Sequence, residues 1–322
     1  MVQIASTGNV ASRYVEGCGV TTSAAANHHN ARMLHMADET NPINPFAVCE
    51  YPCTDARYFA DASLNASTIK ACVASLNPLS VVPAKGRVAQ AHPPKASAAM
   101  ITGSAAHALI LEGEKVYAAR YAVMPTVDRR TKAGKAEVAA WIFDNANKTG
   151  ITEDVDAQVR RMAAAVRANT DARRLLRNGN AEQGIFWTDR ATHVACKARL
   201  DYVTPDGVVV DLKTCQDATE EGFGRAVANF RYHVQAAFYR RAYREFFGGD
   251  LPSFMFIAVE KTAPHSVGVC ELDEGTLDAA DDIINIALRL WSRGDAAAKD
   301  YGQYTVSLRR YQNHLLQMEE TA

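Results

Sequence analysis

The segment from residue 181 to residue 214 constrains the fold of this chain most. β-Branched and aromatic residues occur there together with turn-forming residues at Thr188-Asp189-Arg190 and Pro205-Asp206-Gly207. This pattern is typical of short strands joined by tight turns. The sequence therefore predicts a β-meander of about three strands.

Helical spacing of apolar residues indicates helices before and after this meander. We expect helices at 65–76, 97–112, 217–247 and 275–293, two or three more between 135 and 177, and strands at 121–124, 253–260 and 266–272. A mixed sheet covered by helices accounts for this order of elements, so the predicted fold class is α/β or α+β.

Net charge, apolar runs and cysteine spacing exclude several classes of protein. The chain has 322 residues and a formal charge of -1, so no overall positive field draws it to nucleic acid or to anionic lipid. No apolar run approaches the ~20 residues of a membrane span. The seven cysteines contain no Cys-x-x-Cys pair, which favours reduced thiols. We expect a cytoplasmic protein with no membrane partner.

Three parts of the chain differ in pattern. Residues 1–54 are rich in Ala, Asn, Ser, Thr and His and lack periodicity, so we expect a mobile N-terminal arm. Residues 55–295 carry the predicted elements and form the expected domain. Residues 296–322 are expected to form a C-terminal tail.

The meander carries the residues best suited to chemistry. Asp211 and Lys213 are two apart on a predicted strand and share one face, and a hairpin at the Pro-Asp-Gly turn would bring Asp201 close to Asp211. Two carboxylates favour a hard divalent cation such as Mg²⁺, and a neighbouring lysine suits phosphodiester hydrolysis. The alternative is an exposed ion pair worth about 0–1 kcal/mol.

Two further segments each have a functional and a structural interpretation. Gln235 and Tyr239 are four apart and face one side of a predicted helix. His107 lies among small and apolar residues of the 97–112 helix, where a single histidine is commonly a core residue. When each of these side chains is considered alone, packing or surface exposure explains it better than a function does.

Taken together, seven segments in order resemble the RecE-type exonucleases (exodeoxyribonuclease VIII family) of the PD-(D/E)xK nuclease superfamily. The resemblance covers roughly residues 55–295. The matching segments are 103–112, 128–135, 182–187, 197–201, 211–214, 232–239 and 259–264. The family's usual Arg-Pro-Asp is Arg199-Leu200-Asp201 in this chain. The fold implied is a PD-(D/E)xK restriction-endonuclease-like core with a central mixed β-sheet flanked by helices.

The resemblance also implies roles for individual residues. The implied metal ligands are His107, Asp201, Asp211 and the backbone carbonyl of Leu212, for Mg²⁺ with Mn²⁺ as a substitute. Lys213 is the implied catalytic lysine. Gln235 and Tyr239 are implied to support the active site, and Glu182 lies where these nucleases carry an acid. An iron–sulfur cluster is not expected, because Cys270 is the single cysteine after residue 215.

DNA contacts are expected at the basic segment that contains Arg129, Arg130, Lys132 and Lys135, with Arg199 and Thr214 assigned to the same contact. Neutralising phosphates supplies most non-specific affinity for DNA, so a concentrated basic patch is needed in a chain of near-zero net charge. Two other clusters, at residues 173–177 and 240–244, are equally explained as solvated helix faces.

The resemblance implies a metal-dependent exonuclease that degrades one strand of linear duplex DNA from 5′ to 3′ and leaves 3′ overhangs for homologous recombination. It further implies a bacterial or phage-encoded protein that acts on double-stranded DNA ends, a homo-oligomeric ring and a single-strand annealing protein as partner. Two alternatives stay open: a RecB-like or structure-specific endonuclease that uses the same site, and a catalytically silent module that binds DNA ends.

Overall fold

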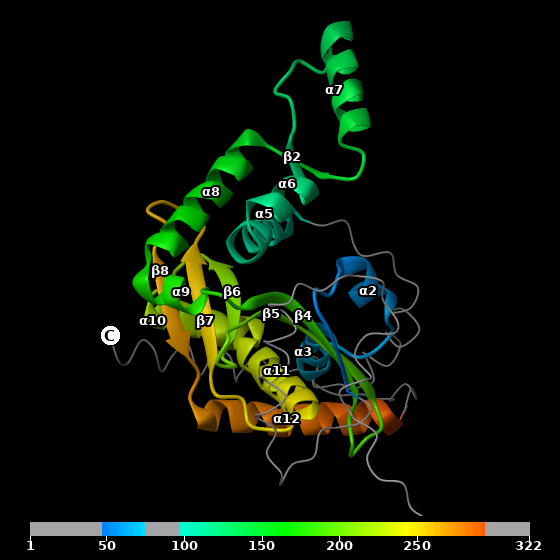
Figure 1. The fold of residues 1–322 in the computed structure, drawn as a ribbon, viewed down its shortest axis with the longest axis vertical. Helices are drawn as coiled ribbons and strands as arrows, with labels where there is room; N and C mark the ends of the chain where they lie inside the picture. The colour runs from blue at the N-terminus through cyan, green and yellow to red at the C-terminus, as the bar shows by residue number, and fades with distance from the viewer. Residues whose placement is uncertain (1–46, 75–96, 294–322) are drawn as a thin grey trace, which may run out of the picture.

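The computed structural model describes residues 47–74 and 97–293. Its centre is a six-stranded sheet in the order β1-β4-β5-β6-β7-β8 (Figure 1). The strands are β1 (Val48–Glu50), β4 (Asn180–Thr188), β5 (Ala195–Val203), β6 (Val209–Cys215), β7 (Phe254–Glu260) and β8 (Val267–Glu271). Strands β6 and β7 run parallel and the other neighbours run antiparallel, so the sheet is mixed, as predicted.

The predicted meander is confirmed as β4, β5 and β6. Strands β4 and β5 pair over almost their whole length, from Asn180 opposite Val203 to Thr188 opposite Ala195. The turn between β5 and β6 includes Gly207 at a φ of +88°, a backbone conformation that favours glycine.

Helices cover both faces of the sheet and bury a separate apolar core on each (Figure 1). One face packs against α3 (Ala66–Ala74), α10 (Glu220–Phe230), α11 (Tyr232–Phe247) and α12 (Glu274–Arg293). The other face packs against α5 (Ala98–His107), α8 (Glu153–Ala168) and α9 (Thr170–Leu175). The result is the three-layer arrangement expected from the order of elements.

Local sequence explains where several helices begin. Helices α5 and α8 start after Ser97 and Thr152, whose hydroxyl groups accept hydrogen bonds from backbone N–H groups of the first turn. Helix α5 continues directly into a π-helical turn, η3 (Ala108–Glu112), and then α6 (Glu114–Arg120). The expected 97–112 helix therefore changes hydrogen-bond pattern immediately after His107.

A second, two-stranded sheet lies outside the core. It consists of β2 (Tyr121–Val123) and β3 (Thr149–Ile151), which run parallel, and it supports α7 (Lys132–Asp144). In Figure 1, α7 projects away from the rest of the molecule. The sequence analysis placed only helices between 135 and 177, so β3 is a strand that it missed.

The N-terminal boundary also differs from expectation. Val48–Glu50 was assigned to the arm of residues 1–54, but it pairs with β4 as an edge strand. The short helix α2 (Asp55–Ala60) follows it. Residues 1–46 and the predicted tail 296–322 lie outside the described residues. Within the described part of the chain, no helix is long and apolar enough to cross a membrane.

Candidate active site

The candidate site forms where β5 and β6 separate. These strands pair only at Tyr202 opposite Val210 and at Val203 opposite Val209. The next pair in this register would be Asp201 and Asp211, but the ladder ends there. The N–H of Leu212 is thereby released from the ladder and instead donates to Oδ2 of Asp201 at 3.0 Å. The two strands therefore separate between the predicted carboxylates, Asp201 and Asp211.

Asp211 and Lys213 lie on the face of the sheet covered by α11, as their alternation along β6 predicts. The Lys213 ammonium is in ion-pair contact with Oδ2 of Asp211, and neither side chain is more than 14% exposed. Oδ1 of Asp211 accepts a hydrogen bond from Nε2 of Gln235 at 2.7 Å. The structure thus joins the predicted Asp-x-Lys pair to the predicted Gln235.

His107 approaches from the opposite layer, at the end of α5. Its Nδ1 lies 3.5 Å from Oδ2 of Asp201. The ring is also hydrogen-bonded to the backbone of Leu212, and this bond must use the carbonyl because the Leu212 N–H already donates to Asp201. His107, Asp201 and the Leu212 carbonyl, three of the four predicted ligands, therefore converge in the gap between β5 and β6.

Burial and crowded charge shape the protonation of the central pair. Burial and the negative charge of Asp201 raise the pKa of Asp211 to about 7. Burial alone would lower the pKa of Lys213, but the carboxylates of Asp211 and Asp201 outweigh it and raise that pKa above its ordinary value. Lys213 consequently keeps its proton and its positive charge at neutral pH.

Glu182 lies on β4 beside this cluster, buried among charged side chains. Its φ is +54°, which is unusual for a non-glycine residue, and its side chain is buried. Burial raises the pKa of Glu182 to about 8; Arg199 opposes the rise, and the carboxylates of Asp201 and Glu112 add to it. The predicted acid is thus close enough to Asp201 to interact electrostatically with it.

Arg199 is occupied within the protein. Its Nε lies 2.7 Å from Oε2 of Glu182, and its guanidinium also forms an ion pair with Asp55 on α2. The guanidinium carbon lies 5.1 Å from the ring centre of Tyr58. In this arrangement Arg199 holds α2 against the sheet, which differs from the DNA contact assigned to it.

Tyr239 lies one turn after Gln235 on α11 and is 8% exposed. Burial raises its pKa well above the ordinary tyrosine value, and its hydroxyl interacts with the Gln235 side chain. Thr214 lies on the other face of β6, where its hydroxyl oxygen would be 3.8 Å from a Cβ on Gly103 of α5. Tyr239 is therefore part of the cluster, and Thr214 flanks it.

Lys70 is a residue that the sequence analysis missed. It lies on α3, and its Nζ donates to Oε1 of Gln235 at 3.1 Å. Burial, together with the nearby charge of Lys213, lowers the pKa of Lys70 to about 8. A lysine in an amphipathic helix more than 160 residues from Gln235 gives no signal in the sequence that could have identified it.

The predicted DNA-binding segment does not join this cluster. Arg129 and Arg130 precede α7, and Lys132 and Lys135 occupy its first turns, on the projection seen in Figure 1. All four side chains are exposed, although Arg130 pairs with Asp128 at 3.0 Å. The arginines at 240, 241 and 244 are all paired with acids, which favours their structural interpretation.

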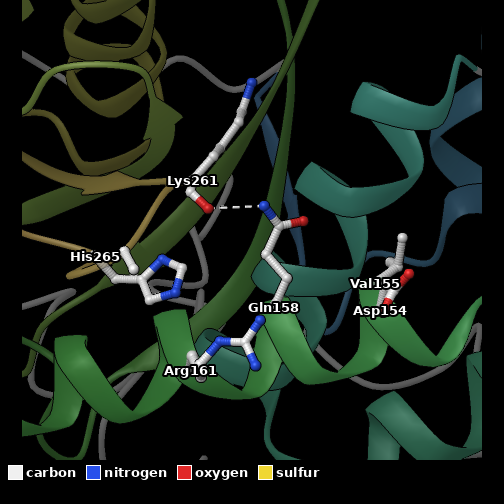
Figure 2. Close-up of a pocket in the computed structure, with 7 residues that line it drawn as sticks. Asp154, Val155, Gln158, Arg161, Lys261 and His265 are labelled. Carbon is white, nitrogen blue, oxygen red and sulfur yellow. Dashed lines mark hydrogen bonds between the residues drawn. The ribbon is translucent and has the colours of Figure 1, made fainter.

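A pocket of about 430 Å³ lies apart from the cluster, between α8 and the turn after β7 (Figure 2). Nε2 of Gln158 donates to the carbonyl of Lys261 at 2.7 Å, and Nδ1 of the buried His265 lies 3.0 Å from the carbonyl of Glu260. The first bond joins the β7–β8 turn to α8, and the second lies within the turn. None of the predicted site residues lines this pocket.

The donor atoms at the cluster suit a divalent cation. Carboxylates, a backbone carbonyl and an imidazole are all metal ligands, and the buried Oδ2 of Asp211 contacts the Lys213 ammonium. Still, no three His, Cys, Asp or Glu side chains in the described ranges converge closely enough to hold a metal. The Asp211 carboxylate contacts Lys213 and Gln235, while the Asp201 carboxylate contacts His107 and the Leu212 N–H.

Comparison with known proteins agrees with this fold. The chain is similar to the structure of a "Putative exonuclease" from Eubacterium rectale, with a TM-score of 0.53 and 14% sequence identity over 80% of this chain and 97% of that chain. No curated protein matches the chain. The model of a family described as a PDDEXK-like domain of unknown function (DUF3799) matches residues 81–290.

These findings confirm the predicted PD-(D/E)xK fold and support a nuclease, whereas the narrower resemblance to RecE-type exonucleases stays a prediction. The matched residues include His107 and every predicted site residue on β4, β5, β6 and α11. The match also spans more than half of the chain. The chain therefore belongs to the PDDEXK-like family DUF3799.

Proposed function

We propose that this protein is a divalent-metal-dependent exodeoxyribonuclease that degrades one strand of linear duplex DNA from 5′ to 3′. The observation that carries the proposal is that His107 contacts Asp201 where β5 and β6 separate, and that the Asp211–Lys213 pair lies on β6 at the same point. Membership in a PDDEXK-like family supports a nuclease that uses a divalent cation. Mg²⁺ is the proposed ion, with Mn²⁺ as a substitute.

His107, Asp201, Asp211 and the Leu212 carbonyl would hold the cation. The chemistry that a divalent cation supplies when bound is Lewis acidity, which lowers the pKa of water and offsets charge on a phosphate oxygen. Lys213 keeps its positive charge beside Asp211, so its ammonium group would stabilise the negative charge that builds on the phosphate during attack. Gln235 would keep Asp211 in place through its hydrogen bond.

The basic segment before and within α7 would bind the DNA backbone away from the reacting phosphate. Helix α7 has no acidic residue in its first turn and carries Lys132 and Lys135 there, although cations are unfavourable at a helix N-terminus. A bound phosphate would offset this unfavourable charge. The remaining proposals rest on the RecE-type resemblance: 3′ overhangs for recombination, a single-strand annealing partner and a homo-oligomeric ring.

A nuclease assay with Mg²⁺ tests the proposal on linear and covalently closed circular duplexes, with the label at the 5′ or the 3′ end. We expect the wild type to degrade only linear DNA and to release the 5′ label first. Asp211→Ala and Lys213→Ala should be inactive. Asp144→Ala and Lys115→Ala, which change exposed residues of the same types, should keep wild-type activity.

Each contrary result has a distinct meaning. Equal activity of the wild type, Asp211→Ala and Lys213→Ala would refute the assigned site. Cleavage of closed circles would favour the endonuclease alternative. A wild type that binds duplex ends without cleaving them, and that shows no heat of Mn²⁺ binding in calorimetry, would favour the silent end-binding module.

A further inference from the structure

Lys70 contacts the candidate site from a part of the chain that the family match does not include. It lies on α3, before residues 81–290. Its neighbour Ile69 is fully buried in the core, where α3 packs against α11 and α12. Lys70 itself is only partly exposed, with its ammonium group directed at Gln235. Packing of α3 therefore holds the Lys70 ammonium group next to Gln235 at the candidate site.

Two hydrogen bonds connect this cation to Asp211. Nζ of Lys70 donates to Oε1 of Gln235 at 3.1 Å, and Nε2 of Gln235 donates to Oδ1 of Asp211 at 2.7 Å. An amide has a donor end and an acceptor end of nearly the same shape, whereas an ammonium group can only donate. Lys70 therefore accepts only one of the two amide orientations, the one that presents the Gln235 NH₂ group to Asp211.

The opposite orientation would be harmful at this site. It would place the amide oxygen against a carboxylate oxygen of Asp211, and two acceptors would then face each other in a buried position. Asp211 would keep Lys213 as a partner but lose the donor on Oδ1. The carboxylate must be correctly oriented to act together with Asp201 and His107.

The aromatic ring of Tyr232 explains how two lysines can lie so close together. The ammonium of Lys70 lies 5.6 Å from the ring centre, and that of Lys213 lies 4.9 Å from it. A π face attracts cations, so the ring provides favourable contacts for both like charges. Lys213 pairs directly with Asp211, whereas Lys70 donates to the Gln235 amide, so the two ammonium groups have different partners.

We propose that Lys70 is a positioning residue of the nuclease site, which locks the Gln235 amide in the orientation that donates to Asp211. This inference rests on the proposed function. It predicts a specific kinetic signature, because Lys70 acts through Gln235 and not on the DNA. Loss of the lysine should lower kcat and leave KM for DNA unchanged, whereas a lysine that bound a phosphate would change KM.

The test compares Lys70→Met, which keeps the apolar stem and removes the donor, with Lys70→Arg, which keeps a donor. We expect Lys70→Met to lower kcat by about 10–100-fold, the usual effect of losing a partner that orients a metal ligand. Lys70→Arg should recover most of this loss. Lys70→Met should have little further effect in a Gln235→Ala background, because the residue through which it acts is gone. Lys115→Met is the matched exposed control.

Circular dichroism and thermal unfolding establish whether each variant is folded. If Lys70→Met is not folded, the Lys70→Arg variant keeps the inference testable. The inference is overturned if Lys70→Met has wild-type kcat, if only its KM rises, or if its effect persists fully without Gln235. A wild type that cleaves no DNA would remove the proposed function and this inference together. If the wild type is active, Asp211→Ala is inactive and Lys70→Met is fully active, this inference alone is overturned.

Discussion

Replacing Glu182 by Gln is expected to make the stability of this protein less dependent on pH. Burial holds the pKa of Glu182 at about 8 in the folded protein, against an ordinary value of 4.5. The native state therefore keeps this proton across a pH range in which the unfolded chain has already lost it. The free energy of unfolding must fall as the pH rises from about 4.5 to about 8.

The size of the effect follows from the same two values. A difference between 4.5 and about 8, at about 1.4 kcal/mol per pH unit, corresponds to about 5 kcal/mol. The site can relax and admit water once Glu182 is charged, which reduces the penalty, so we expect roughly half of this amount, about 2–3 kcal/mol. Glutamine resembles the protonated acid in shape and charge, so the variant should lack this dependence.

Urea unfolding of both proteins at pH 5, 7 and 9 measures the difference. The two proteins should be equally stable at pH 5, and Glu182→Gln should be about 2–3 kcal/mol more stable at pH 9. Glu137→Gln, at an exposed position of α7, should match the wild type at every pH. A difference between Glu182→Gln and the wild type that is the same at all three pH values would refute the reasoning.

Three other outcomes are expected. Replacing Arg129, Lys132 and Lys135 together by Gln should reduce the steepness of the plot of log affinity for DNA against log salt concentration by about 2–3, at roughly 0.9 per lost phosphate contact. Fluorescence anisotropy on a duplex would measure this slope, and an unchanged slope would mean that the segment does not contact DNA. His107→Ala should weaken Mn²⁺ binding by at least about tenfold in calorimetry, or about 1.4 kcal/mol, and unaltered binding would exclude His107 as a ligand. Phe238→Ala should cost about 3–5 kcal/mol in urea unfolding, because Phe238 is fully buried and its ring centre lies 5.1 Å from that of Trp187.

Elements that depend on local pattern could be predicted from the amino-acid sequence. Alternation along residues 209–215 already places Asp211 and Lys213 on one face, and the Pro-Asp-Gly turn predicts the hairpin that brings Asp201 close. The meander, the helices on either side of it and the mixed sheet follow from the same short-range rules. Resemblance to known nucleases added His107, whose imidazole could not be recognised as functional from its apolar surroundings.

Other features were beyond the reach of sequence patterns because they are set by contacts between distant segments. The early end of the β5–β6 ladder places Leu212 against Asp201, and it depends on how β6 pairs with β7 along its whole length. Edge strand β1 is only three residues long and gains its structure from pairing with β4, so its local sequence resembled an unstructured arm.

The surroundings of Asp211 depend on how distant parts of the chain pack together. Packing of α3 against α11 brings Lys70 to Gln235, and contacts with Asp55 and Glu182 hold Arg199 inside the protein despite its basic character. The charge of a side chain can be read from the sequence, but its partner depends on which helices cover which face of the sheet. Burial then sets the pKa values of Asp211 and Glu182, because removing a carboxylate from water penalises its charged form.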